Sequence, residues 1–110
     1  MSRIALSDGS GWFDAEKAVK FEEATFWNGN NHISRATGSQ WEHEALYFTR
    51  ANRWVLNEWS QRQGSIEAYR EIDVAEAAQW LVENERSDAL AELPDDVRAR
   101  LNEALAKREV

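Results

Sequence analysis

The stretch from Trp41 to Gln61 constrains the fold more than any other part of the sequence. β-Branched and aromatic residues are dense in it and Ala51-Asn52 lies at its centre, a pattern typical of two strands joined by a tight turn. A two-residue turn predicts that Arg50 faces Arg53 across this hairpin. The same register predicts the pairs Phe48 with Val55, Tyr47 with Leu56, and His43 with Ser60. A turn one residue longer would exchange the faces of one strand, so the register depends on the length of the turn.

Both faces of this predicted hairpin carry apolar side chains. In the two-residue register, one face holds Leu46, Phe48, Val55 and Trp59, and the other holds Trp41, Tyr47, Trp54 and Leu56. Neither face is therefore marked as the solvent side. After a turn at residues 62–65, apolar and polar residues alternate from Ile66 to Ile72 and predict a third strand of an antiparallel meander. An exposed edge strand of this kind could pair with a second copy, which leaves a homodimer open.

The N-terminal part predicts a short hairpin followed by a helix. Residues 3–6 alternate weakly, the glycine-containing segment 8–11 suits a tight turn, and Trp12-Phe13 has the character of a returning strand. Asp14 can cap a helix, and the residues after it favour helix. Helical spacing is provided by Ala15, Ala18 and Val19, with Glu22 continuing it. We therefore expect a helix from Asp14 to about Ala24.

The C-terminal part predicts two helices. Asp73 and Glu76 have the spacing of a capping box, and a regular apolar stripe follows to about Asn84. The stripe consists of Val74, Ala77, Ala78, Leu81 and Val82. A last helix has Pro94 near its start and its own stripe of Val97, Leu101, Ala104 and Leu105. Its acidic face is that of a solvated helix. The alternative is a peripheral element over residues 87–110 that docks into a partner's groove.

These elements predict one α+β domain over residues 1–110. A chain of 110 residues with 43% hydrophobic content has room for a single core. We expect an antiparallel β-meander of about three to five strands, with an N-terminal helix and two C-terminal helices packed on it.

Charge and composition exclude several classes of function. The formal net charge is −7, and residues 73–110 contribute −5 of it, from five basic and ten acidic side chains. A general binder of phosphate backbones, which presents a basic stripe, is therefore not expected. The chain has no cysteine, which excludes disulfides and thiolate sites. It has no apolar run of membrane-spanning length and no signal-peptide pattern at its start, so we expect a cytoplasmic protein without a membrane partner.

Four segments carry a resemblance to other proteins. Residues 44–50, 53–56 and 72–81, together with Phe13–Ala18, resemble a loose group of small uncharacterised bacterial, plasmid and phage proteins. Their shared pattern is Glu-x-Leu-Tyr-x-Thr, a turn, an aromatic strand, and an acidic-capped helix with a late Trp-Leu. The chain departs from that pattern at Phe48, Ala51 and Asn52, where the group has a polar residue and a glycine-containing turn. The resemblance spans about residues 12 to 84, implies a helix-plus-meander fold, and brings no catalytic residue.

The polar residues offer only weak signs of catalysis. In Glu42-His43-Glu44 a strand would point His43 away from both carboxylates, and the only other histidine, His32, is not at a metal-ligand spacing. The predicted pairing of His43 with Ser60, near Glu58, lacks the glycine-flanked turn that exposes a nucleophilic serine. We expect no metal and no cofactor. An enzyme using His43, Glu44 or His32 is kept as an alternative.

Two groups of residues are candidates for binding. The Asn-rich segment 28–31 predicts a loop, with Trp27 and Trp41 nearby. Arginines interleave with the aromatic strands, and Trp, Tyr and Arg are the residues that most often anchor protein interfaces. The candidate set is Trp27, Asn28, Asn30, Asn31, Trp41, Arg50, Arg53, Trp54 and Trp59. We expect a small non-enzymatic bacterial accessory or regulatory protein that binds another protein. The alternative is a binder of single-stranded nucleic acid through sheet aromatics and arginines.

Overall fold

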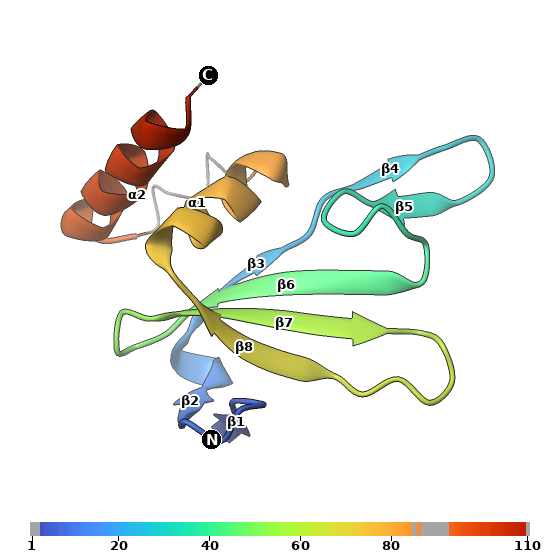
Figure 1. Cartoon of the computed structure of the whole chain (residues 1–110), viewed down its shortest axis with the longest axis horizontal. Coiled ribbons are helices and arrows are strands. Elements are labelled where there is room, and N and C mark those ends of the chain that lie inside the picture. Colours follow the sequence, from blue (N-terminus) through green and yellow to red (C-terminus); the bar gives the residue numbers. More distant parts are fainter. Residues whose placement is uncertain (1–2, 85, 87–92, 110) are drawn as a thin grey trace.

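The computed structural model describes residues 3–84, 86 and 93–109, which form an α+β fold of antiparallel sheets and two α-helices (Figure 1). The strands are β1 (Arg3–Ala5), β2 (Trp12–Asp14), β3 (Val19–Glu22), β4 (Thr25–Trp27), β5 (His32–Ser34), β6 (Glu42–Phe48), β7 (Trp54–Ser60) and β8 (Ala68–Ile72). The helices are α1 (Val74–Glu83) and α2 (Asp95–Arg108), and a 3-10 turn, η1, covers Ala15–Lys17. The α+β class is confirmed, and the strands outnumber the three to five expected.

The central element is a four-stranded sheet with the order β3-β6-β7-β8, and every neighbouring pair in it is antiparallel. β6, β7 and β8 are the predicted meander. Two small hairpins, β1-β2 and β4-β5, form separate two-stranded sheets. No helix among the described residues is long and apolar enough to cross a membrane.

The expected helix from Asp14 to Ala24 is wrong. Asp14 caps only the 3-10 turn, where its carboxylate accepts a hydrogen bond from the Glu16 N–H at 3.0 Å. The chain then becomes strand β3, which pairs with β6. Val19 and Phe21 face the core two residues apart, and Phe21 is buried. A β-branched and an aromatic residue at period two suit an edge strand, and burial against β6 outweighs the local helix preference of residues 15–18.

The two-residue turn between β6 and β7 is also wrong, because the turn contains three residues. The Thr49 N–H donates to the Arg53 carbonyl at 2.8 Å, and the Thr49 carbonyl accepts the Asn52 N–H at 2.9 Å. Asn52 has a φ of 64°, a left-handed conformation that asparagine tolerates better than most residues. Phe48 therefore pairs with Trp54, Leu46 with Leu56, and His43 with Trp59. The chain thus adopts a turn one residue longer than the two-residue turn, and the faces of one strand are exchanged.

The corrected register explains why both faces of the sheet are apolar. One face packs against α1 and α2 (Figure 1). The buried members of this core are Phe21, Leu46, Phe48, Trp54, Leu56, Ile72, Ala77, Ala78, Trp80, Leu81, Leu93, Val97, Leu101 and Ala104. The other face is covered by the N-terminal hairpin, where Leu6 and Phe13 pack on Tyr47 and Val55. The sheet is thus the middle layer of the molecule.

The two predicted C-terminal helices are confirmed. The Asp73 carboxylate accepts the Glu76 N–H at 2.8 Å and caps α1, as the sequence pattern predicts. In α2, Val97 and Leu101 are buried against the main core. Residues 87–92 and 110, which belong to the segment expected as a peripheral element, lie outside the described residues.

Candidate binding site

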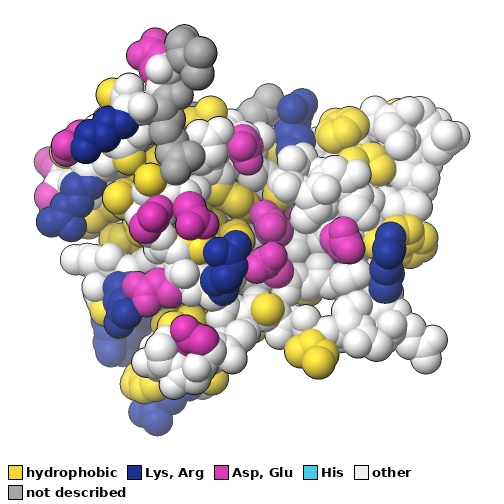
Figure 2. All heavy atoms as spheres, viewed as in Figure 1, with side chains coloured by type: hydrophobic (Ala, Val, Ile, Leu, Met, Phe, Trp, Pro, Cys, Tyr) yellow, Lys and Arg dark blue, Asp and Glu magenta, His cyan; other side chains and the backbone are white. Residues whose placement is uncertain are grey.

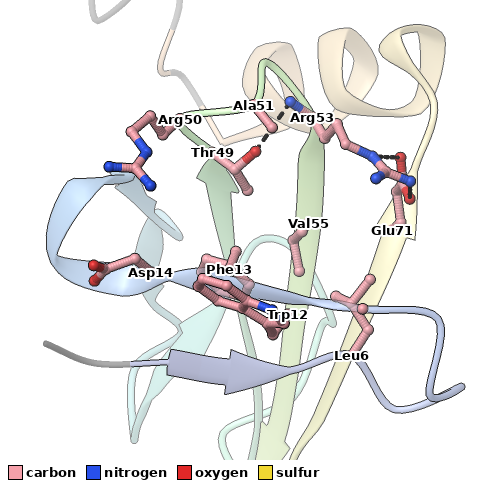
Figure 3. A pocket seen from close by; sticks show the side chains of 11 residues that line it. Leu6, Trp12, Phe13, Asp14, Thr49, Arg50, Ala51, Arg53, Val55 and Glu71 are labelled. Carbon is pink, nitrogen blue, oxygen red and sulfur yellow. Dashed lines mark hydrogen bonds and ion pairs between the residues drawn. The ribbon is translucent and has the colours of Figure 1, made fainter.

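An apolar cavity of about 230 Å³ lies between the N-terminal hairpin and the β6-β7 turn (Figure 3). We call it the Trp12 pocket. Its lining consists of Leu6, Gly11, Trp12, Phe13, Asp14, Thr49, Arg50, Ala51, Arg53, Val55 and Glu71. The lining comes from β2 and the loop before it, from the β6-β7 turn, and from β7 and β8.

The floor of the Trp12 pocket is apolar and firmly packed. Leu6, Phe13 and Val55 are 8%, 6% and 2% exposed and belong to one hydrophobic cluster. The Phe13 ring lies 5.1 Å from the Tyr47 ring and 6.0 Å from the Tyr69 ring, between centroids. Such tilted aromatic contacts hold the ring in place. The floor is therefore formed before any ligand arrives.

The indole of Trp12 forms the outer wall of the pocket. Adjacent residues of a strand point to opposite sides, so the burial of Phe13 leaves Trp12 turned outward, and 55% of Trp12 is exposed. The Arg3 guanidinium lies 4.8 Å from the centroid of the Trp12 ring, within the range of a cation–π contact. An exposed tryptophan beside an apolar floor offers a flat surface to a second molecule.

Two arginines lie at the turn end of the pocket and differ in their pairing. Arg53 donates two hydrogen bonds to Glu71, from Nε to Oε2 at 2.8 Å and from Nη2 to Oε1 at 2.6 Å (Figure 3). The hydrogen bonds that Arg53 donates to the Glu71 carboxylate raise the pKa of Arg53 above its ordinary value. Arg50 is exposed and makes no ion pair or hydrogen bond with any of the residues that the structure describes. It is thus an available cation beside the apolar floor.

Sequence reasoning found part of this site. Arg50 and Arg53 are members of the candidate set and both line the Trp12 pocket. Trp12, Phe13 and Leu6 were missed as site residues. The signal for Trp12 was available, because two adjacent aromatic residues on one short strand cannot both face the same layer.

The Asn-rich candidates lie in the turn of the β4-β5 hairpin. The Asn28 side-chain oxygen accepts hydrogen bonds from the N–H groups of Asn30 and Asn31 at 2.9 and 2.8 Å. This oxygen therefore stabilises the turn. Trp27 is 59% exposed, and its ring contacts the His32 ring edge-on, with 5.1 Å between ring centroids. These residues form an exposed turn, separate from the Trp12 pocket.

The remaining tryptophan candidates are spread over the sheet. Trp41 precedes β6 and Arg50 follows it, which puts them at opposite ends of a strand roughly 23 Å long. Trp54 is 5% exposed, and its ring packs against the Phe48 ring, with 4.7 Å between ring centroids. Trp59 is half-buried and stacks on His43, with 5.6 Å between ring centroids. The structure does not bring these three rings to one surface.

A buried polar cluster joins the β4-β5 hairpin to the main sheet. The Glu23 carboxylate accepts hydrogen bonds from the Ser34 hydroxyl and from the Glu44 N–H at 3.3 Å. Its other oxygen lies 2.6 Å from His43 Nδ1. His43 Nε2 is buried and has no hydrogen-bond partner among the described residues. Because a carboxylate is an acceptor, this geometry places the ring proton on Nδ1.

A second cavity, of about 490 Å³, lies beside this cluster. It is lined by Thr37, Glu42, His43, Glu44, Glu58, Trp59, Ser60, Ser65, Ile66 and Ala68. Glu44 accepts the Trp80 indole N–H at 3.0 Å, and burial raises the pKa of its carboxyl, with Glu58 and Glu23 adding to the effect. Within the described part of the chain, no three His, Asp or Glu side chains converge as metal ligands.

Comparison with known protein families, with curated proteins and with solved structures finds no match to this chain. The candidate site is therefore argued from its own residues and their geometry.

Proposed function

We propose that this chain is a small non-enzymatic bacterial accessory protein that acts in the cytoplasm by binding another protein. In this proposal, the Trp12 pocket receives one apolar side chain of the partner. The observation that carries the proposal is the buried floor of Leu6, Phe13 and Val55 beneath the exposed Trp12 ring. An apolar floor open at an aromatic rim is the typical environment of an interface anchor.

The size of the pocket favours a side chain over a cofactor. Its volume of about 230 Å³ lies below the roughly 300 to 1,000 Å³ of small-molecule and cofactor sites. A single Leu, Met or Phe side chain fits that volume better than a nucleotide would. A floor held by ring contacts also lowers the entropy that binding must overcome.

The two alternatives have less support from the geometry. A binder of single-stranded nucleic acid needs open ring faces, whereas Tyr47 and Trp54 are buried beneath the N-terminal hairpin and the helices. An enzyme based on His43 needs an accessible ring nitrogen, whereas Glu23 occupies Nδ1 and Nε2 is buried. His32 contacts the exposed Trp27 instead.

The test blocks the pocket without touching the core. Ala51 is an exposed turn residue that lines the pocket, so Ala51→Trp places a large ring over the floor. Trp12→Ala removes the outer wall and is a second, independent variant. Gln63→Trp adds the same ring in an exposed loop outside the pocket and serves as the matched control. Thermal unfolding of each variant checks that the fold is kept.

Affinity capture from a lysate of the source cells then compares the four proteins. We expect the wild-type protein and Gln63→Trp to retain the same partner, and Ala51→Trp and Trp12→Ala to lose it by at least roughly tenfold, as hot-spot residues do. Capture of the same partner by all four proteins, or of none by the wild-type protein, contradicts the proposal.

A further inference from the structure

We infer that the segment received by the Trp12 pocket carries a carboxylate next to its apolar side chain, and that Arg50 binds this carboxylate. The inference rests on the proposed function and identifies the chemistry of the partner. It is carried by the juxtaposition, in one small cavity, of a buried apolar floor and the Arg50 guanidinium, which pairs with none of the residues that the structure describes.

The pairing of the other charged side chains singles out Arg50. Glu71 is committed to Arg53 through two hydrogen bonds. The Asp14 carboxylate accepts the Glu16 N–H and caps the 3-10 turn. Arg50 has no such commitment to any described residue. A guanidinium in this position can donate two parallel hydrogen bonds to a carboxylate.

The pocket is less negative than the protein as a whole. Its lining holds the cations Arg50 and Arg53 and the carboxylates of Asp14 and Glu71, so its formal charges balance. Arg3, which lies beside the Trp12 ring but does not line the pocket, adds a further cation nearby. The whole chain has a net charge of −7, and Figure 2 shows Asp and Glu side chains across the middle of the face that it displays. An anionic group is therefore favoured at the pocket more than elsewhere on this surface.

The positions of the two arginines suggest how a bound segment would lie. In Figure 3, the Arg53–Glu71 pair stands on the β8 side of the pocket, and Arg50 stands on the side of the 3-10 turn, near Asp14. The apolar floor lies between them and below. A side chain inserted toward Val55 would thus leave the adjoining backbone at the rim, where a neighbouring carboxylate can reach Arg50.

The experiment uses three small probes that share a phenyl group and differ in charge. They are 4-phenylbutyrate, 4-phenylbutanamide and 4-phenylbutylamine. Binding is followed on the full chain by the shift of the Trp12 indole N–H signal in NMR spectra, assigned with Trp12→Phe. We expect 4-phenylbutyrate to bind roughly three- to fivefold more tightly than the amide, because an exposed ion pair with good geometry adds up to about that much. The amine should bind most weakly.

Arg50→Gln tests the role of the arginine. It should make the butyrate and amide affinities equal, within about twofold, while the amide affinity stays as in the wild-type protein. Arg62→Gln, in an exposed loop outside the pocket, should keep the preference for butyrate. Equal binding of all three probes to the wild-type protein, or an unchanged preference in Arg50→Gln, overturns the inference and leaves the pocket intact. Failure of all three probes to bind contradicts the proposed function itself.

Discussion

At the residue scale, the pocket arises because neighbours in the sequence have opposite environments. Trp12 is 55% exposed and Phe13 is 6% exposed, since a strand directs successive side chains to opposite sides. Phe13 thus anchors the N-terminal hairpin to the sheet, and Trp12 faces outward. Arg50 and Arg53 are both exposed and differ in their pairing, because Glu71 pairs with Arg53, whereas Arg50 pairs with no residue that the structure describes. Neighbouring residues of one type thus have different surroundings in the pocket.

Glu44 gives a prediction about pH at this scale. Burial raises the pKa of its carboxyl above the unfolded value, so ionisation of Glu44 disfavours the folded state. The protonated Glu44 carboxyl stabilises the folded state. This stabilisation is fully present below the pKa of Glu44 in the unfolded chain and is lost as the pH rises through its pKa in the folded protein. Glu44→Gln keeps an acceptor for the Trp80 indole and cannot ionise. We expect this variant to be more stable than the wild-type protein at pH 7 and to lose that advantage near pH 4.

Urea unfolding at the two pH values measures this effect. Glu103→Gln, an exposed residue of α2, is the control and should show no comparable gain at pH 7. A Glu44→Gln variant that is less stable than the wild-type protein at pH 7 would show that the carboxylate itself stabilises the fold.

At the scale of elements, specific side chains attach each outlying piece to the central sheet. The Ser7 hydroxyl accepts the Tyr69 N–H at 2.8 Å, and the Ser7 N–H donates to the Tyr69 carbonyl at 2.8 Å. On the opposite edge, Arg86 Nε donates to the Glu22 carbonyl at 2.7 Å. These bonds use backbone groups that an edge strand would otherwise offer to another chain. A homodimer formed by pairing along β8 would have to displace Ser7.

The β4-β5 hairpin gives a prediction at this scale. The two carboxylate oxygens of Glu23 accept three hydrogen bonds from β5 and β6. A glutamine side chain has one carbonyl oxygen and one NH2 group, and the NH2 group can only donate, so glutamine could not accept all three. Glu23→Gln should therefore lower the free energy of unfolding by about 1–3 kcal/mol. Glu22→Gln, at the exposed last residue of β3 and next to Glu23 in the sequence, should change it by less than about 0.5 kcal/mol.

Hydrogen exchange distinguishes a local effect from a global one. In Glu23→Gln, the backbone amides of Phe26 and Ile33, which pair across the hairpin, should exchange faster relative to those of β6 and β7. Equal stability of Glu23→Gln and the wild-type protein would show that the cluster does not hold the hairpin.

At the scale of the whole molecule, three layers form around one sheet: two helices, the four strands, and the N-terminal hairpin. The helices cover the apolar side chains on one face of β6 and β7, and the N-terminal hairpin covers those on the other face, because side chains alternate between the faces along each strand. The Trp12 pocket lies at the border of the hairpin layer and the β6-β7 turn. Binding there requires no movement of the main core, because its floor belongs to the smaller cluster.

What the sequence predicts correctly depends on how local the determinants are. α1 follows from the Asp73 cap and an apolar stripe within the helix, and α2 follows from its own apolar stripe after Pro94. Strand β3 depends on burial of Phe21 against a strand more than twenty residues away, and the register of β6 and β7 depends on the left-handed Asn52. The pocket combines Leu6 and Phe13 with Val55. Its arginines are recognisable from their residue type, whereas its floor requires the tertiary fold.

Reversible closure of the Trp12 pocket in a single sample shows whether ligands bind there. The chain has no cysteine, so Ala51→Cys provides one thiol at the rim, which a phenethyl disulfide reagent can block. We expect blocking to abolish the shift that 4-phenylbutyrate causes in the Trp12 indole N–H signal, and reduction of the disulfide to restore it. Binding of the probe with the same affinity before and after blocking would contradict the claim that this pocket is the binding site.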